Sequence, residues 1–363
     1  MLMNRIRIYI LVFFYLAITF LAWFKPAEEI SDSELRPLTQ FPELSAKTIV
    51  SGSFMSEFEK YTLDQFPFRD RFRTLKAVTY LYGFGRYDNN GIYIEDGYSV
   101  KMEYPMNRES VEYAVGRLKN VYQKHIAGSG SRCYVSVIPD KNFYLAASHG
   151  ALAMDYDTLF DIVKEGMDFA EYIDISNILE EKSFYRTDTH WDQSCIREVA
   201  QRLAGCMNVT LDTEFRINTA DAPFYGVYYG QAALPQKPDD MKYVTNDAIA
   251  SAKVIDRQND RIMPVYDESR MATRSPYDFF LGGPLSLIEI ENPLAENDRN
   301  LVVFRDSFGS SLVPLLISGY RKITVADIRY IPGDRIGKFI DFKNSDVLFL
   351  YSTLILNNSS TLK

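Results

Sequence analysis

The sequence predicts an α/β fold, a mostly parallel sheet flanked by helices, preceded by one N-terminal transmembrane helix. Two observations lead to this prediction. The first is an unbroken apolar run over residues 8–24. The second is the alternation of short β-branched runs with amphipathic helical patterns along the rest of the chain, a pattern typical of parallel α/β sheets.

The apolar run has the length and charge asymmetry of a membrane anchor. At about 1.5 Å per residue, a helix over residues 8–24 just crosses a hydrocarbon core of roughly 30 Å. Arg5 and Arg7 precede it, which predicts a cytoplasmic N-terminus and a main domain outside the cytoplasm. Residues 24–27 lack the small-residue pattern of a signal-peptidase site. We therefore expect a single-pass protein of the cell membrane, anchored by an uncleaved helix.

The composition of successive segments predicts the domain limits. Residues 1–25 form the cytoplasmic tip and anchor, residues 26–50 a polar stalk, and residues 51–363 one large extracytoplasmic domain. The net charge of −8 and the lack of a basic patch argue against a nucleic-acid partner.

The large domain shows a regular order of elements. Apolar spacing predicts helices, and β-branched runs predict strands. The expected helices cover residues 54–66, 110–126, 194–203 and 308–317, and the expected strands cover residues 134–138, 172–175, 301–304, 323–326 and 347–351. Residues 207–297, rich in Gly, Pro and Asp, are expected to be mostly loop.

The first chemical motif is Asp188-Thr189-His190-Trp191. In an extended segment, positions i and i+2 point the same way. The Asp188 carboxylate can then accept the Nδ1 proton of His190 and leave Nε2 free as a base. The competing interpretation is a helix-capping Asp beside an incidental His, and this motif alone does not decide between them.

The second motif, Arg305-Asp306-Ser307-Phe308-Gly309, lies between an expected strand and an expected helix. Such a turn exposes a serine hydroxyl at the carboxyl edge of a parallel sheet, near the unpaired N–H groups of a helix start. Those groups can stabilise the oxyanion of an acyl-transfer intermediate. The alternative is that Ser307 is simply a helix N-cap. Ser307 together with Asp188 and His190 supplies a nucleophile, a base and an orienting group.

These motifs resemble the DHHW family and the related alginate O-acetylation proteins of the AlgX/AlgJ type. Further segments share the resemblance, and together they span the chain from about residue 30 to its C-terminus. They are Asp64-Gln-Phe-Pro-Phe-Arg69, Pro139-Asp140-Lys141, Phe224-Tyr-Gly226-Val-Tyr-Tyr-Gly230 and Asp327-Ile-Arg329-Tyr330. The resemblance implies an SGNH-hydrolase-like fold with permuted motif order, because the Asp–His block precedes the Ser block.

The resemblance also implies residue roles: Ser307 as nucleophile, His190 as base and Asp188 as orienting group. Substrate-binding or supporting roles are expected for Lys141, Arg305, Asp306, Arg329 and Tyr330. One departure is Thr189, where DHHW members carry a second His. Asp188, His190 and Asp192 alone are a poor ligand set for zinc, so we expect no metal and no cofactor. The oxyanion-hole Gly and Asn have no clear match. Gly282-Gly283 and Asn357 are the candidates, and a structural role is the favoured interpretation of each.

Three functions follow from these readings. The first is an extracytoplasmic O-acetyltransferase acting on a cell-surface or secreted polysaccharide. One spanning helix cannot carry acetyl groups across a membrane, so this function implies a multi-spanning membrane O-acyltransferase as donor partner. The second is a carbohydrate acetyl-esterase, in which water takes the acyl group. The third is a non-catalytic glycan-binding or assembly subunit, whose Tyr and Phe side chains stack on sugars.

Overall fold

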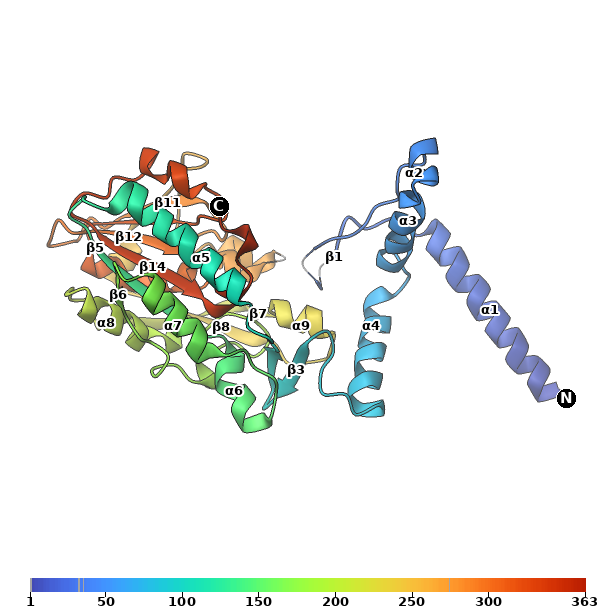
Figure 1. Ribbon diagram of the computed structural model, residues 1–363. Helices are drawn as coiled ribbons and strands as arrows, with labels where there is room; N and C mark the ends of the chain where they lie inside the picture. Colours follow the sequence, from blue (N-terminus) through green and yellow to red (C-terminus); the bar gives the residue numbers. More distant parts are fainter. Residues whose placement is uncertain (1, 32, 35, 274) are drawn as a thin grey trace. The chain divides into compact units, whose positions relative to one another are not determined.

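The computed structural model describes residues 2–31, 33–34, 36–273 and 275–363. The chain divides into two compact units (Figure 1). The first unit contains Met1–Asn90 and Tyr229–Pro235, and the second contains Gly91–Tyr228 and Gln236–Lys363. The predicted limits of anchor, stalk and extracytoplasmic domain stay predictions.

The first unit begins with the long apolar helix. It comprises α1 Leu2–Phe24, β1 Ile30–Ser31, β2 Arg36–Pro37, α2 Ala46–Val50, α3 Ser53–Asp64 and α4 Arg69–Val78. Within α1, Arg5–Phe24 has a mean hydropathy of 2.0 and is 0% buried. Length and composition therefore fit a single-pass anchor or a signal sequence.

The segment that joins α3 to α4 is held by a buried carboxylate. Asp64 accepts two hydrogen bonds from Arg36, at 3.0 and 2.6 Å, and two from Thr39, both at 2.9 Å. The hydrogen bond from Arg36 is the largest cause that holds the pKa of Asp64 far below its ordinary value, against the opposing effect of burial. Asp64, the first residue of one family-like segment, thus makes structural contacts within this unit.

The second unit is built on an eight-stranded sheet in the order β10-β9-β11-β13-β12-β14-β5-β6. The five strands from β13 to β6 run parallel, and β11, β9 and β10 continue the sheet antiparallel. The strands are β5 Arg132–Ile138, β6 Glu171–Tyr172, β9 Lys253–Asp256, β10 Arg261–Met263, β11 Leu287–Glu291, β12 Asn300–Arg305, β13 Lys322–Ala326 and β14 Asp346–Ser352.

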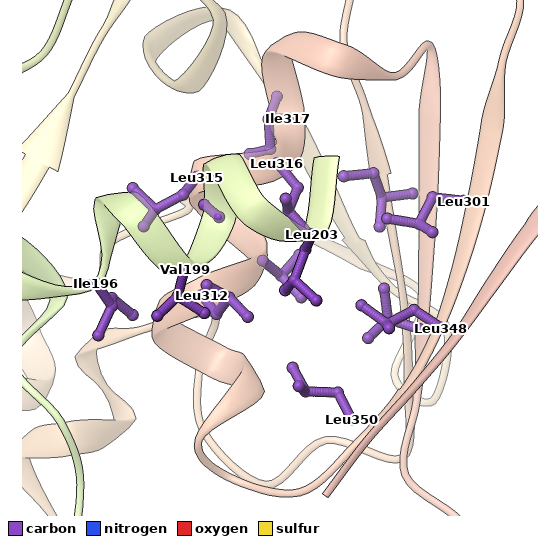
Figure 2. Packing of buried hydrophobic residues seen from close by; sticks show 14 of the residues in the cluster. Ile196, Val199, Leu203, Leu301, Leu312, Leu315, Leu316, Ile317, Leu348 and Leu350 are labelled. Carbon is purple, nitrogen blue, oxygen red and sulfur yellow. The ribbon is translucent and has the colours of Figure 1, made fainter. Parts of the chain in front are cut away.

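Helices cover both faces of this sheet, because successive side chains of a strand point to opposite faces. In β14, Val347 and Phe349 pack with α5 and α7, whereas Leu348 and Leu350 pack with α8 and α11. Figure 1 shows α5 beside α7, and Figure 2 shows leucines of α8 and α11 converging on the strands. Truncating one such leucine to Ala typically costs about 2–5 kcal/mol of stability. The helices of this unit are α5 Arg108–Val121, α6 Lys141–His149, α7 Tyr156–Gly166, α8 Arg197–Cys206, α10 Asp247–Ser251, α11 Gly309–Leu316 and α12 Thr353–Asn357, and α9 Val227–Ala232 spans the limit between the two units.

The predicted α/β fold class, a mostly parallel sheet flanked by helices, is confirmed, but the loop-rich expectation for residues 207–297 is wrong in part. Three strands of the central sheet lie there, β9, β10 and β11. A separate antiparallel pair, β7 Arg216–Phe224 with β8 Asp239–Thr245, lies there too. Asp, Gly and Pro flank these strands, and β7 is mostly exposed, so a continuous apolar run is missing. A second hairpin joins β3 Ile92–Glu95 to β4 Tyr98–Lys101.

Candidate active site

Ser307 lies in the turn between β12 and α11. β12 ends at Arg305 and α11 begins at Gly309. The turn is fixed by Asp306, whose Oδ1 accepts a hydrogen bond from the Phe308 amide at 3.0 Å. Its Oδ2 accepts one from the Ser352 amide, at the end of β14, at 2.7 Å. The neighbouring residues are buried, but Ser307 itself is partly exposed. The hydroxyl is therefore presented at the carboxyl edge of the parallel strands.

The N-cap interpretation of Ser307 does not fit this turn. The cap position of α11 is Phe308, without a side-chain cap hydrogen bond, and the side chain that accepts from the turn's backbone belongs to Asp306. Gly309 is required for close packing, since a Cβ there would lie 2.7 Å from Cβ of Arg305. The serine hydroxyl is left to make a different hydrogen bond.

The Asp188–His190 segment forms the tip of a hairpin-like loop. An isolated bridge pairs Phe184 with Trp191, and the Tyr185 amide donates to the His190 carbonyl at 3.0 Å. The segment is bent, so the expected extended geometry is wrong. The two side chains meet through a local turn instead, in which Asp188 Oδ1 accepts the His190 amide at 3.0 Å. Asp commonly makes such contacts two residues along the chain.

Three side chains are hydrogen-bonded in series. His190 Nδ1 donates to Asp188 Oδ1 at 2.5 Å, and the Ser307 hydroxyl donates to His190 Nε2 at 2.8 Å. Ser307 and His190 are 117 positions apart in the sequence. The 2.8 Å separation places the serine hydroxyl within the reach that a general base needs. The arrangement can deliver a serine proton to an imidazole whose opposite nitrogen is held by a carboxylate.

Asp188 is buried yet suited to carry a negative charge. Burial raises its pKa, but the charge of His190 and hydrogen bonds from His190 and the Val227 amide outweigh it, so the pKa lies below its ordinary value. The Val227 amide donates to Asp188 Oδ2 at 2.9 Å. The ionised carboxylate accepts hydrogen bonds only, which fixes the proton of His190 on Nδ1.

Close packing against Asp188 requires a glycine at position 226, in the family-like segment over residues 224–230. A Cβ at Gly226 would lie 2.2 Å from Cβ and 2.3 Å from Cα of Asp188. The Gly226 amide also donates to Thr187 Oγ1 at 3.0 Å. The absence of a side chain at this position therefore lets the loop pack directly on the orienting carboxylate.

Two aromatic residues complete the surroundings of His190. The ring of Tyr277 stacks on the imidazole with centroids 3.7 Å apart and planes 6° from parallel, and its hydroxyl donates to Ser311 Oγ at 2.8 Å. Trp191 Nε1 also donates to Ser311 Oγ at 2.8 Å. Tyr277 was not expected from the sequence. It lies in the segment taken for loop, and no motif spacing connects it to His190.

The five residues expected to bind substrate or to support the site lie at different depths. Lys141, Arg305 and Asp306 are buried, with at most 2% of their surface exposed. Arg305 donates to the Gly283 carbonyl at 3.2 Å and lies 3.7 Å from Asp327, which also pairs with Arg329 at 2.6 Å. Their burial suits supporting roles. Tyr330 is 48% exposed.

The candidates for the oxyanion hole have other partners. The Gly283 amide donates to the Phe280 carbonyl at 3.2 Å, and both Gly282 and Gly283 adopt positive φ. Asn357 is buried in α12, where its Oδ1 accepts the Asn107 amide at 2.6 Å. These contacts give all three residues structural roles. Among the described residues, none accepts a hydrogen bond from the Ser307 amide, which leaves that amide as a possible oxyanion donor.

One group of side chains outside this site has metal-ligand chemistry. Donor atoms of Glu95, Asp96 and His149 lie within 4.8 Å of one another at the β3–β4 hairpin. His149 Nδ1 is 3.1 Å from Glu95, and Asp96 is exposed. At the Ser307 site, His190 Nδ1 and Asp188 Oδ1 are used by each other.

Comparisons with known proteins give a family match to this part of the chain. The family described as DHHW protein matches residues 170–326, a segment that contains Asp188, His190 and Ser307. No curated protein shows significant sequence similarity to the chain.

Several solved structures share the fold. A DHHW family protein from Eubacterium siraeum is 22% identical, with a TM-score of 0.61, and the alignment covers 76% of this chain and 95% of that one. Bacillus cereus PatB1 is 17% identical, with a TM-score of 0.58 and coverage of 73% and 96%. PatB1 has also been solved with a sulfonyl adduct.

The family match covers both chemical motifs, and the DHHW family structure has the same fold over most of its length. Residues 170–326 of this chain therefore match the DHHW family, and the chain shares its fold with a solved member of that family.

Proposed function

We propose that this chain is an extracytoplasmic O-acetyltransferase that modifies a cell-surface or secreted polysaccharide through Ser307, His190 and Asp188. The observation that carries the proposal is the hydrogen bond from the Ser307 hydroxyl to His190 Nε2, 2.8 Å long, in series with the bond from His190 to Asp188. Nucleophile, base and orienting group are the parts that covalent acyl transfer requires.

In the first half-reaction, Ser307 Oγ attacks the carbonyl carbon of an acetyl donor, and its proton passes to His190 Nε2. The Ser307 amide, which has no acceptor among the described residues, donates a hydrogen bond to the tetrahedral oxyanion. His190 then donates the proton to the leaving group, the bond between the acetyl carbon and the donor breaks, and an acetyl-serine remains. Asp188 keeps the imidazole in the required tautomer and stabilises the imidazolium.

In the second half-reaction, a sugar hydroxyl gives its proton to His190 and attacks the acetyl-serine. Collapse of the intermediate releases the acetylated sugar, and the proton returns to Ser307. Water can replace the sugar hydroxyl with the same triad, which gives an esterase instead. The outcome depends on how well the site excludes water.

The polysaccharide acceptor rests on the sequence resemblance to alginate O-acetylation proteins. Topology supports an extracytoplasmic reaction, because Arg5 and Arg7 favour a cytoplasmic N-terminus. Another membrane protein must then transfer the acetyl group across the membrane. A multi-spanning O-acyltransferase would fit this role as donor partner.

The test uses the full-length protein in detergent, with an activated acetyl ester as donor. Wild-type protein should accumulate acetyl on the peptide that contains Ser307, detected by mass spectrometry, and pass it to an added oligosaccharide. Ser307→Ala and His190→Ala should each abolish turnover, and the double variant should be hardly worse, because members of a triad fail as a unit. An aryl sulfonyl fluoride should label Ser307 in the wild type.

Ser310→Ala is the matched control. Ser310 is the buried second residue of α11, and among the described residues its hydroxyl has no hydrogen-bond partner, so the variant should keep full activity. Unchanged turnover in Ser307→Ala would refute the proposal. Acetyl release to water alone, at saturating oligosaccharide, would show an esterase.

A further inference from the structure

Lys141 is a buried cation at the first position of α6. Only 2% of its surface is exposed. Its ammonium donates to the carbonyls of Tyr185 and Arg186, at 3.0 and 3.3 Å, and lies 5.0 Å from the centroid of the Tyr228 ring. Burial of a charge costs free energy unless polar groups surround it, so favourable interactions must offset the burial of Lys141.

Asp239, the first residue of β8, contacts the same stretch of backbone with the opposite charge. Its carboxylate accepts the amides of Arg186 and Thr187, both at 2.8 Å, and the Thr187 hydroxyl at 2.6 Å. Hydrogen bonds to ionised groups are shorter and roughly twice as strong as those between neutral groups. Residues 185–187 are thus held at their carbonyls by a cation and at their amides by an anion.

The held residues directly precede Asp188 and His190. Lys141 belongs to a helix that follows β5, and Asp239 belongs to a separate β-hairpin. Two elements distant in sequence therefore fix one short loop from two sides. Catalytic groups lose about 10²-fold in rate when displaced by roughly 1 Å, so the position of this loop controls whether His190 reaches Ser307.

We propose that Lys141 and Asp239 form a charge clamp, a buried cation and a partly buried anion that together position the Asp188–His190 loop for the acyl transfer proposed above. Lys141 and Asp239 are positioning residues. They act on the backbone of the loop and do not contact the acyl group. This inference rests on the proposed function, because its main readout is turnover through Ser307.

The clamp makes catalysis depend on the charge of Lys141. Burial lowers the pKa of Lys141 to about 7, while the nearby charges of Asp188, Asp239 and Asp140 act in the opposite direction. The ring of Tyr228 also faces the ammonium. With a pKa of about 7, Lys141 should be mostly charged at pH 6 and mostly neutral at pH 9.

The test compares Lys141→Met with the wild type in full-length protein, using the activated ester and oligosaccharide. We expect kcat to fall about 10- to 100-fold with KM changed less than about twofold, since about 1 Å of misplacement has effects of this order. The deficit should be larger at pH 6 than at pH 9. The melting temperature at pH 9 should stay close to that of the wild type, because the substitution there removes a neutral amine and not a charge.

Asp239→Asn provides the second variant, so the result does not depend on the folding of one protein. It keeps the shape and removes the charge, and its kcat should fall in the same way. Lys182→Met is the matched control, because this exposed lysine pairs with Glu180 at 2.8 Å near the base of the same loop. It should keep wild-type kcat.

The outcomes separate this inference from the proposed function. Wild-type kcat in both Lys141→Met and Asp239→Asn, with Ser307→Ala inactive, would overturn the clamp alone. The clamp would also be overturned if the loss of kcat in these variants matched a loss of thermal stability at every pH. Activity in Ser307→Ala would instead overturn the proposed function.

Discussion

Gly226→Ala is the sharpest steric test of the site, because it adds one carbon beside Asp188. The added Cβ would lie 2.2 Å from Cβ and 2.5 Å from Oδ2 of Asp188. Carbon atoms in contact normally lie about 3.5–4.0 Å apart, so the two segments must separate by more than about 1 Å. Cα of Asp188, at 2.3 Å, is backbone and cannot be relieved by a rotamer change.

A shift of this size in the orienting carboxylate should lower kcat about 100-fold, or roughly 2.7 kcal/mol in activation free energy. Overpacking should also cost about 1–3 kcal/mol of stability. The assay is ester turnover alongside urea unfolding.

The matched control is Gly116→Ala, in the middle of α5. Its Cβ would have nothing within 4 Å, so it should gain about 0.5–1 kcal/mol from helix propensity and keep full activity. Wild-type kcat in folded Gly226→Ala would refute the claim that close packing on Asp188 sets the catalytic geometry.

Three further predictions concern the aromatic stack, the buried lysine and the topology. Tyr277→Phe keeps the ring stacked on His190 and should retain activity within about threefold. Tyr277→Leu should lose about tenfold in kcat, since aromatic pairs contribute about 0.5–1.5 kcal/mol, and equal kcat values for the two variants would contradict this. Lys141 has a pKa of about 7 in the folded protein against an ordinary value of 10.5, so the unfolded chain binds more protons between these two pH values. The free energy of unfolding should therefore rise with pH in this range, by up to about 1.4 kcal/mol per pH unit. Urea titrations of the wild type and Lys141→Met measure this effect, and a difference between them that does not change with pH would count against it. Cys195 is exposed, so a membrane-impermeant thiol reagent should label it on intact cells at pH 8.5 and fail on Cys195→Ser; labelling only after lysis would place the domain inside.

The parallel half of the sheet was predictable because its long strands are buried on both faces, and its two middle strands contain unbroken apolar runs. β12 and β14 are such strands, and the helices packed on them have clear amphipathic spacing. β9 and β10 are short, and Asp and Asn lie between them. β9 joins the sheet by pairing with β11, and β10 joins it by pairing with β9. No local pattern encodes the pairing of β9 with β11.

The candidate site was predictable to the extent that its residues are adjacent in sequence. The contact expected between Asp188 and His190 is present, but the local geometry is not the extended one that was expected. A bend brings the two side chains together through an Asp side-chain turn. Tyr277 was missed, since its stacking on His190 depends on the path of an irregular segment. Lys141 was expected from resemblance, but its contacts with the carbonyls of residues 185 and 186 are a property of the fold.

These contacts show why the two chemical motifs are far apart in sequence and still act at one point. Ser307 is fixed by the sheet, because Asp306 joins the β12 turn to the end of β14. His190 is fixed by a loop outside the sheet, and buried polar contacts from α6, β8 and Gly226 hold that loop. The serine therefore has a rigid position by topology alone, whereas the histidine depends on charged and hydrogen-bonded neighbours. Substitutions around Asp188 should accordingly change activity more readily than equally conservative substitutions behind Ser307, where the core of the sheet resists displacement.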